Sequence, residues 1–428
     1  MSREMKHSGI DWIGVIPKGW NIDTIGNLYT LRTEKVSDKD YAPLSVTKMG
    51  IVPQLETAAK TDDGDNRKLV RVGDFAINSR SDRRGSCGIS AYDGSVSLIN
   101  LILTPRGQMN PRFYNWLFHS ELFADEFYKW GHGIVDDLWT TRWQEMKRIT
   151  IVAPSLSEQQ KIAEFLNKKC GEVDEMIALQ EQIIEELKAY KQSVITEAVT
   201  KGLNPNVPMK DSGIELIGEI PEHWMVSRLK AVLLKIESGV SVNAGGDFSN
   251  DGNKYVLKTS CVSRNVFIHT ECKKVEEYDL HRVSCPVKAD TLIVSRMNTP
   301  ELVGTCGYCK NDIYNVFLPD RLWQVSLIEG MRTKYFWYLL IGNTTRNYLS
   351  SLSTGTSSSM QNISQPQFGN TPITIPPLAE QQAIVDYLDN KCGDIDALIA
   401  LKQQKIESLK EYKKSIIYEY VTGKKEVI

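Results

Sequence analysis

The sequence predicts an α+β protein built on a pseudo-two-fold internal repeat, in which two β-rich variable regions with small sheets are each followed by a long helical block. Two observations predict this fold class. Residues 154–203 return at 376–425 without a gap, and 26 of the 50 aligned positions are identical. Residues 6–20 return at 210–224, with 9 of 15 positions identical. Each copy therefore places a short block before a variable region and a long block after it.

The long block is predicted to be helical. Ser157 followed by Gln160 is a capping-box pattern, so we expect a helix to begin there. The second copy has Ala379 in place of the cap. Cys170-Gly171 is predicted to break this helix, and a longer one is expected after it. Its length of about 30 residues corresponds to a rod of roughly 45 Å.

Apolar residues of the longer helix follow heptad spacing, which predicts a seam against a partner helix. Gln180 and Lys402 place polar side chains on the same seam. The alternative is an ordinary amphipathic helix packed on its own domain. We favour packing of the two copies on each other, because duplicated sequences readily make a two-fold contact. The seam residues are Val173, Met176, Ile177, Ile183, Ile184, Leu187, Tyr190 and Val194, with Ile395, Leu398, Ile399, Ile406, Leu409, Tyr412 and Ile416 in the second copy.

The short repeated block, KHSGIDWIGVIPKGW in its first copy, combines turn-forming glycine and proline with apolar residues. We interpret it as a compact docking strip with a structural role. In the first variable region, 21–150, strands are predicted at Leu69–Val72, Phe75–Asn78 and Val96–Thr104. Residues 112–130 are predicted to form one buried helix whose aromatic side chains belong to the core.

The second variable region, 225–375, corresponds to the first only in outline. Asp74 and Arg80 correspond to Asp290 and Arg296, and Cys87-Gly88 corresponds to Cys306-Gly307. The frames match while the middles differ in sequence and length. This pattern suggests one scaffold that carries two different recognition surfaces.

Composition bounds the class of protein. The chain has 428 residues, 24% of them charged and 41% hydrophobic, which is ordinary for a globular protein of several domains. The formal net charge is −2, which argues mildly against a nucleic-acid binder. However, residues 225–375 carry 16 basic against 12 acidic residues. We expect no signal peptide, because the first residues lack an apolar core, and no membrane span, because no apolar run is long enough. The eight scattered cysteines fit reduced thiols, so we expect a cytoplasmic protein.

Catalytic and metal motifs are weak. Asn110-Pro111-Arg112-Phe113 is similar to an amino-methyltransferase loop, but a helix that begins at a proline explains it better. Residues 131–136 do not complete a dinucleotide loop, and no phosphate loop occurs. Cys306 and Cys309, with Cys272 and Cys285, are interpreted as core thiols, with a zinc site as the alternative. We therefore expect no catalytic and no metal-binding residues.

Binding chemistry is better represented. Residues 79–85 place three arginines in a turn, and arginine binds both phosphates and guanine edges. A polar loop precedes each long block, at 131–142 and 353–365. A solvated surface and a flexible connector are the respective alternatives. The DNA-facing residues selected are Arg80, Arg83, Arg84, Trp139, Thr140 and Arg142 in the first region, and Lys258, Arg264, Arg296, Asn298, Ser357, Ser358 and Gln361 in the second.

The repeated blocks carry a family resemblance. SGIDWIGVIPKGW and SGIELIGEIPEHW, with PSLSEQQKIAEFL and PPLAEQQAIVDYL, resemble the specificity subunit of type I restriction–modification enzymes. The block ends EAVTKGL and EYVTGKK are similar to that family as well. The resemblance covers about a third of the chain, in the same order and twice.

The resemblance implies a target-recognition domain at 1–153, a conserved helical region at 154–203, a second target-recognition domain at 204–375 and a second helical region at 376–428. Each domain is then expected to read half of a bipartite site in double-stranded DNA. The two long helices are expected to form an antiparallel pair that separates the two domains and sets the unread spacer. They are also expected to dock two modification subunits, which methylate adenine with S-adenosylmethionine. Restriction subunits would use ATP with magnesium. The chain itself would bind no cofactor and catalyse nothing; the rival classes are a coiled-coil scaffold and an enzyme with an unrecognised site.

Overall fold

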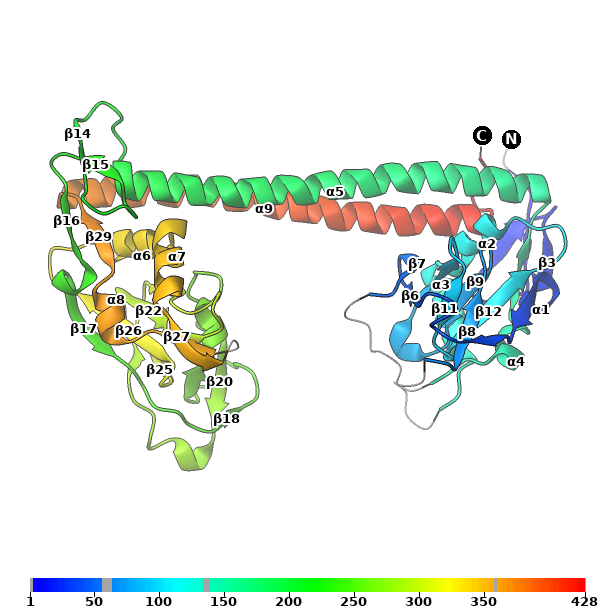
Figure 1. Cartoon of the computed structure of the whole chain (residues 1–428), viewed down its shortest axis with the longest axis horizontal. Coiled ribbons are helices and arrows are strands. Elements are labelled where there is room, and N and C mark those ends of the chain that lie inside the picture. The colour runs from blue at the N-terminus through cyan, green and yellow to red at the C-terminus, as the bar shows by residue number, and fades with distance from the viewer. Residues whose placement is uncertain (1–2, 56–63, 134–138, 358–359, 428) are drawn as a thin grey trace. The chain divides into compact units, whose positions relative to one another are not determined.

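A computed structural model describes residues 3–55, 64–133, 139–357 and 360–427, without the side chains of 355–357 (Figure 1). The chain divides into two compact units. Unit 1 comprises Met1–Gln182 and Lys402–Ile428, and unit 2 comprises Ile183–Leu401. Each unit therefore contains one variable region and a part of both long helices. No helix of the described residues is long and apolar enough to cross a membrane.

The long helices are α5 (Leu156–Lys201, 46 residues) and α9 (Leu378–Val421, 44 residues). The predicted break at Cys170-Gly171 is wrong, because α5 continues through it. A glycine inside a helix costs only about 1 kcal/mol. Cys170 and Val173, which flank this glycine, are both buried, and packing of such a face contributes more to a helix than propensity does. The helices are consequently longer than the expected 30 residues.

The N-terminus of α5 has a capping box two residues earlier than predicted. Glu158 N donates to Ser155 Oγ at 3.3 Å, and Ser155 N donates to Glu158 Oε2 at 3.4 Å. Ser157, the predicted cap, lies inside the first turn. In the second copy Pro377 occupies the position of Ser155, so α9 begins without this box.

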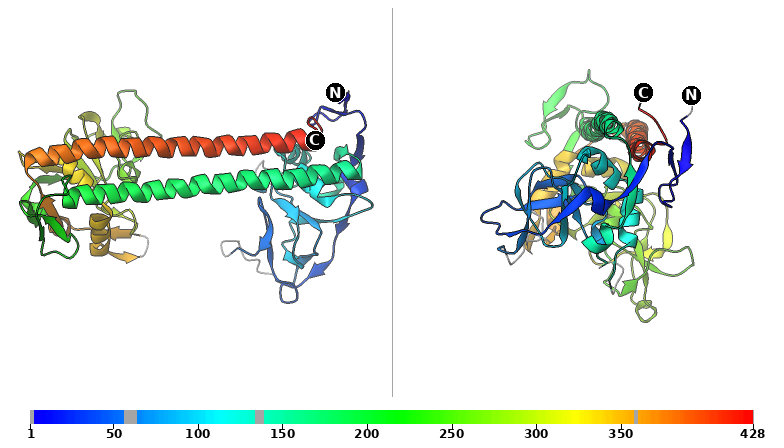
Figure 2. Two further views of the ribbon diagram at one scale, coloured as in Figure 1. Left: turned by 90° about the horizontal axis from the view of Figure 1, so that it is seen from above. Right: turned by 90° about the vertical axis from the view of Figure 1, so that its right-hand side faces the viewer.

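Within unit 1, α5 and α9 pack side by side in antiparallel directions (Figure 2). Lys413 Nζ lies 2.6 Å from Asp174 Oδ1, and further along α9 the Tyr420 ring lies 4.3 Å from the earlier Phe165 of α5. Unit 2 contains the equivalent ion pair, between Lys191 Nζ and Asp396 Oδ2 at 2.7 Å. Lys191 corresponds to Lys413 and Asp174 to Asp396 at the repeat offset of 222 positions, so one contact is used twice.

The heptad seam is present but is not uniformly buried. Val173, Ile184, Val194, Ile395, Ile406, Leu409 and Ile416 are buried, while Ile177, Ile183, Leu187 and Ile399 are partly buried. Gln180 and Lys402 are partly buried on the same line. Met176 and Leu398 are exposed, and Tyr190 and Tyr412 are each 49% exposed. Each of these four side chains directly precedes a partly buried position of the same helix, and so lies at the edge of the seam.

The core sheet of unit 1 has the order β10-β9-β12-β4, with every pair antiparallel. One face carries Phe75, Ile77 and Leu103, which pack against two helices and the ends of α5 and α9. The predicted strand Phe75–Asn78 is β9. The predicted run 96–104 is two strands, because a turn separates them. The bounds are β4 Tyr29–Arg32, β9 Phe75–Asn78, β10 Cys87–Ile89, β11 Gly94–Val96 and β12 Asn100–Pro105.

The helices on this face are α2 (Pro111–Phe118) and α3 (Glu121–Lys129), so the single predicted helix at 112–130 is wrong. Ser120 ends the first helix and begins the second: its hydroxyl donates to Leu117 O at 2.7 Å and accepts from Phe123 N at 3.3 Å. The core role of the aromatics is confirmed, because Phe113, Tyr114, Phe118, Phe123 and Phe127 are all buried. Asn110 caps α2 by accepting from Arg112 N at 2.9 Å, which confirms the helix start at a proline.

The opposite face of this sheet carries a second layer. Ala76 and Ile102 pack there against Leu44, Ile51 and Val96. The layer consists of a β6–β7 hairpin and the sheet β11-β8-β5, and the predicted strand 69–72 lies two residues early, as β8. The bounds are β5 Lys35–Val36, β6 Leu44–Thr47, β7 Gly50–Pro53 and β8 Arg67–Val70.

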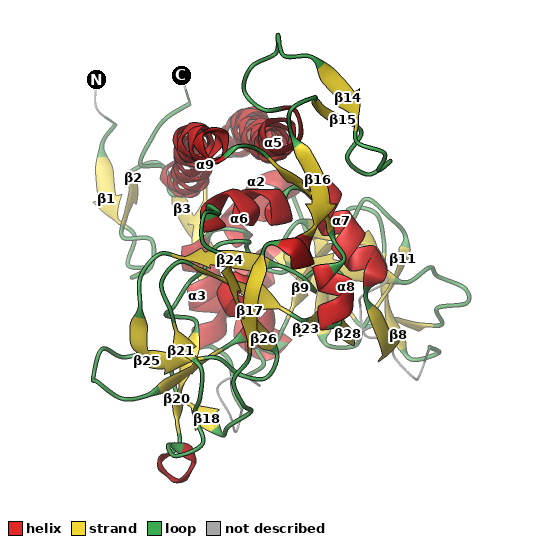
Figure 3. Ribbon diagram, turned by 90° about the vertical axis from the view of Figure 1, so that its left-hand side faces the viewer, coloured by secondary structure: helices red, strands yellow, loops and turns green. Residues whose placement is uncertain are grey.

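Unit 2 repeats the frame of unit 1 with a different second layer. Its core sheet, β24-β22-β26-β17, has the same order of equivalent strands, and α6 lies between this sheet and the long helices (Figure 3). The second layer is a five-stranded sheet, β18-β20-β19-β25-β21. The bounds are β17 Leu233–Glu237, β18 Ala244–Gly245, β19 Tyr255–Leu257, β20 Cys272–Val275, β21 Pro286–Val287, β22 Thr291–Ser295, β24 Cys306–Cys309, β25 Ile313–Phe317, β26 Leu322–Leu327, α6 Thr333–Ile341 and α7 Asn343–Leu352.

The short repeated block docks where the next long helix begins. Trp20 is fully buried and donates from Nε1 to Glu158 Oε1 at 3.0 Å; Trp224 does the same to Glu380 Oε2 at 2.9 Å. The structural role predicted for the block is therefore confirmed. The remaining elements are β1 Met5–His7, β2 Val15–Pro17, β3 Asn21–Thr24, α1 Ile25–Leu28, α4 Trp143–Met146 and β13 Thr150–Ala153, with β14 Met209–Asp211, β15 Glu219–Pro221, β16 Met225–Arg228, α8 Gln365–Gly369 and β29 Pro372–Ile375.

Candidate functional site

In unit 1 the arginine turn and the polar loop before the long helix form one surface. Arg80 pairs with Thr140 in an isolated antiparallel bridge. Ser81 N donates to Trp139 O at 2.9 Å, and Thr141 N donates to Ser79 O at 3.0 Å. Segments about sixty residues apart in the sequence are thus joined by backbone hydrogen bonds. The structure brings together the two stretches that the sequence analysis selected in this region.

The arginines of this surface differ in exposure and in their contacts with the protein. Arg83 and Arg142 are exposed, and Arg80 is partly buried. Arg84 forms an ion pair with Asp125 and lies over the Tyr128 ring, 5.7 Å from its centroid. Arg84 is therefore held against α3, and its charge is partly neutralised within the protein. Trp139 and Thr140 are partly buried, and the neighbouring residues 134–138 lie outside the described part of the chain.

The equivalent turn of unit 2 forms a small ribbon. Strand β23 (Met297–Asn298) pairs with β28 (Met360–Asn362), which places Asn298 opposite Gln361. Arg296 Nε donates to Asp320 O at 2.8 Å, so one guanidinium nitrogen is already engaged. The side chain of Asn298 donates to Ser295 Oγ at 3.3 Å and accepts from Thr299 N at 2.9 Å. The structure brings Arg296, Asn298 and Gln361 together, while it gives part of their hydrogen-bonding capacity to the turn itself.

The other residues selected in unit 2 lie elsewhere or beyond description. Lys258 and Arg264 flank a 3-10 helix, η4 (Thr259–Val262), in the second layer. Lys258 Nζ lies 3.6 Å from Asp247 Oδ1, and Arg264 is exposed. Ser357 ends β27 (Thr354–Ser357), which pairs with β28, but its side chain is not described. Ser358 lies outside the described residues.

Cys306 and Cys309, interpreted as core thiols with half a zinc site as the alternative, are both buried and lie on opposite faces of one strand. Cys306 belongs to the core that faces the helices, and Cys309 belongs to the core of the second layer. Side chains three apart in a strand point to opposite faces, so the two thiols cannot bind one ion. Burial raises the pKa of Cys306 to about 12. No group of three potential ligand side chains occurs among the described residues.

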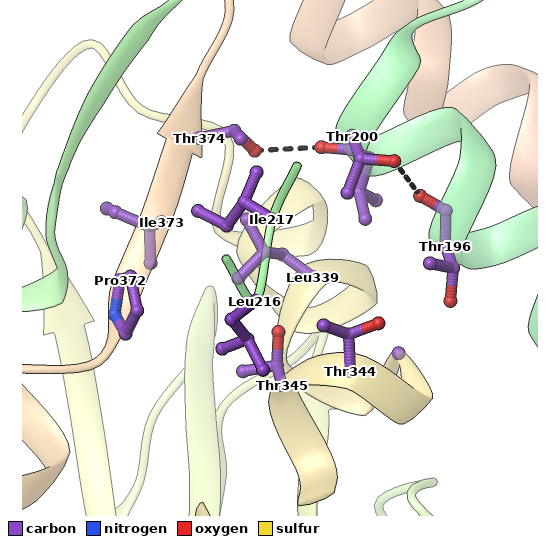
Figure 4. A pocket seen from close by; sticks show the side chains of 12 residues that line it. Thr196, Thr200, Leu216, Ile217, Leu339, Thr344, Thr345, Pro372, Ile373 and Thr374 are labelled. Atoms are coloured by element: carbon purple, nitrogen blue, oxygen red, sulfur yellow. Dashed lines mark hydrogen bonds between the residues drawn. The ribbon is translucent and has the colours of Figure 1, made fainter. Parts of the chain in front are cut away.

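A cavity at the junction of α5 with its domain in unit 2 is too small for a ligand (Figure 4). Its volume is about 20 Å³, which is room for about one water molecule. Thr200 Oγ1 donates to Thr196 O at 2.7 Å and Thr374 Oγ1 donates to Val199 O at 2.8 Å, so both hydroxyls are engaged. We interpret this cavity as a packing defect at the helix end.

Comparison with known proteins places this frame in a family. Residues 221–411 match the model of the type I restriction modification DNA specificity domain. The chain is 30% identical to the type I restriction enzyme MjaVIII specificity subunit of Methanocaldococcus jannaschii, over 96% of this chain and 93% of that protein. The chain belongs to the specificity subunits of type I restriction–modification enzymes.

Further comparisons agree with this assignment. The specificity subunit is also 24% identical to the EcoKI specificity subunit of Escherichia coli K12, over 90% of this chain and 84% of that one. A structure described as showing complex assembly of the type I restriction–modification system matches with a TM-score of 0.70 at 15% identity, over 95% and 99% of the two chains. The HsdS subunit from Thermoanaerobacter tengcongensis matches with a TM-score of 0.50 at 17% identity, over 95% and 98%. The expected α+β fold is confirmed, and the protein is a subunit for recognition of a DNA target. Neither rival class, the scaffold or the unrecognised enzyme, is supported.

One exposed turn of this specificity subunit escaped the sequence analysis. Lys48 and Met49 join β6 to β7, and both side chains are exposed. The sequence does contain a signal for a β-hairpin here: two residues and Gly50 lie between two short runs that contain β-branched residues. Nothing in the sequence places this hairpin against the edge strand β10, because that approach is formed only by the packing of the second layer on the core sheet.

Proposed function

We propose that each unit reads one half of a bipartite DNA site. The observation that supports this most directly is the division of each unit into a shared frame and a different second layer. Both frames have one sheet order and two helices on one face. The second layers differ, being a hairpin with a three-stranded sheet in unit 1 and a five-stranded sheet in unit 2. A conserved frame with divergent outer layers suits two readers of different sequences.

The long helices are proposed to set the length of the unread spacer. Their continuity supports this role, since α5 and α9 run for 46 and 44 residues without a break. The pairing of Lys191 with Asp396 and of Lys413 with Asp174 adds a register to the apolar seam, because a shifted register would separate both pairs. A helix pair of defined register is a suitable ruler.

The same helices are proposed to dock two modification subunits. Exposed apolar side chains recur at equivalent positions of the two copies: Leu179 and Leu401 are 53% and 60% exposed. Met176 and Leu398 are exposed as well, one turn earlier in each copy. Exposed apolar residues that gather on a helix favour a protein partner. Because every one of them occurs once in each unit, two identical partners fit better than one.

Chemistry is assigned to the partners. We infer that modification subunits bind S-adenosylmethionine and methylate adenine, and that restriction subunits use ATP with magnesium. The chain itself is proposed to bind neither cofactor and to be non-catalytic. Its relatives are specificity subunits of type I restriction enzymes, which supports this division of labour.

The test is a map of methylated adenines in DNA from cells that express the chain with its modification subunits. We expect one bipartite sequence with an unread spacer. Replacement of residues 21–150 by the equivalent region of a relative should then change one half-site and leave the other. A change in both half-sites, or methylation without sequence preference, would refute the proposal.

A further inference from the structure

The turn between β6 and β7 in unit 1 presents two side chains to solvent on a rigid support. Met49 is 89% exposed, so its side chain makes almost no contact with the protein. The Thr47 hydroxyl donates to Gly50 O at 2.9 Å and accepts from Met49 N at 3.1 Å, which closes the turn. Lys48 is exposed as well. A single exposed methionine is ordinary on a protein surface. It is the position of Met49 in the fold that indicates a binding role.

That position is set by a glycine on the edge strand of the core sheet. A Cβ added to Gly88 of β10 would lie 2.8 Å from Gly50 Cα, closer than such atoms approach. Only a glycine therefore lets the hairpin lie this close to β10. Because β10 follows the arginine turn after two residues, the Lys48–Met49 turn is held at the same edge of the sheet as that turn.

Unit 2 uses the equivalent glycine in the same way. Gly307 lies on β24, the strand that matches β10 in the sheet order, and a Cβ added there would lie 2.7 Å from Phe267 Cα. The segment that approaches it is the loop Arg264–Phe267 rather than a hairpin. This loop carries exposed Arg264 and Val266, whose side chain is 50% exposed.

Two second layers of different topology thus place the same pair of side-chain types at the same edge. Each offers one cation and one exposed apolar side chain, on a segment that packs against the edge strand next in the chain after the turn of Arg80 or Arg296. Phosphates attract the cation, and the methyl group of thymine is the apolar feature of the major groove. We propose that Lys48 and Met49 contact DNA in the first half-site, Lys48 at a phosphate and Met49 at a base, as Arg264 and Val266 do in the second. This inference rests on the proposed function.

The test uses the full chain in complex with its modification subunits, and two DNA duplexes: the target found by methylation mapping, and an unrelated sequence. Met49→Ala should weaken binding of the target about five- to a hundredfold, as the loss of one base contact does. Binding of the unrelated duplex should not change. Met49→Leu, which keeps an apolar side chain, should retain most of the affinity. Met225→Ala is the matched control, because Met225 is exposed on β16 of unit 2.

Lys48→Ala should weaken both duplexes alike and reduce the slope of log K against log salt by about one. Lys210→Ala, an exposed lysine of β14, is its control. If Met49→Ala changes neither the affinity for the target nor the methylated sequence, the inference is overturned while the proposed function stands. Relaxation of the same half-site by Met49→Ala and Val266→Ala would overturn it too. If the parent complex binds no duplex, the proposed function itself fails.

Discussion

A buried leucine of α5 offers a sharp test of how the long helices are shared between the two units. Leu166 is fully buried in the core of unit 1. Leu166→Ala removes three carbon atoms from this core and leaves a cavity, so we expect a loss of about 2–5 kcal/mol in the free energy of unfolding. For a unit of this size, roughly 2–4 °C of melting temperature are lost per kcal/mol. The expected decrease is therefore about 4–20 °C.

The assay combines calorimetry with hydrogen exchange resolved along the chain. Amides of unit 1 should lose protection, and those of unit 2 should keep it. Leu388, the repeat counterpart of Leu166, is fully buried in the core of unit 2, so Leu388→Ala should give the mirror result. Leu179→Ala is the control on the same helix: because Leu179 is largely exposed, it should change stability by less than about 0.5 kcal/mol.

Two results would refute this reasoning. A loss below about 1 kcal/mol for Leu166→Ala would mean that the core does not depend on this side chain. Equal loss of protection in both units would mean that they unfold as one cooperative body, and the division at 182 and 402 would then have no energetic meaning.

Three further predictions concern recognition, pH and the spacer. Arg80→Ala should weaken DNA binding more than Arg84→Ala, because Asp125 already engages Arg84; titration at several salt concentrations separates a phosphate contact from a base contact. Burial raises the pKa of Glu158, but hydrogen bonds from Trp20, Ser155 and Arg3 outweigh it and leave this pKa below its usual value. Glu158 should thus stabilise the fold at neutral pH and lose that effect as the pH falls through its folded pKa, so urea unfolding of Glu158→Gln should depend less on pH between 7 and about 3. One added heptad in both α5 and α9, with the seam in register, should lengthen the unread spacer by about 10 Å or three base pairs; methylation mapping that returns the original spacer would contradict the ruler.

Local patterns in the sequence were sufficient wherever one short-range interaction decides the outcome. The heptad spacing of Val173, Ile184 and Ile406 predicted a seam, and the proline of 110–113 predicted a helix start, because both signals are periodic or local patterns that can be read along the chain. The same reasoning failed at Gly171 and at Ser120. At Gly171 the buried neighbours outweighed the local preference, so α5 continues through the glycine. At Ser120 a hydroxyl that bonds to Leu117 and Phe123 ends one helix and begins the next, a local signal that the aromatic pattern concealed.

By itself the sequence determined the duplication, the two helices, the family and the two stretches from which DNA contacts were chosen, since identity between the copies and local spacing are properties of the chain alone. Only the tertiary structure decided which contacts the side chains of those stretches make within the protein. It tied Arg84 to Asp125, placed Cys306 and Cys309 on opposite faces of a strand, and brought the Lys48–Met49 turn beside Gly88. These contacts join residues far apart in the chain, and they depend on how a second layer of strands packs on a shared sheet, which no local pattern encodes.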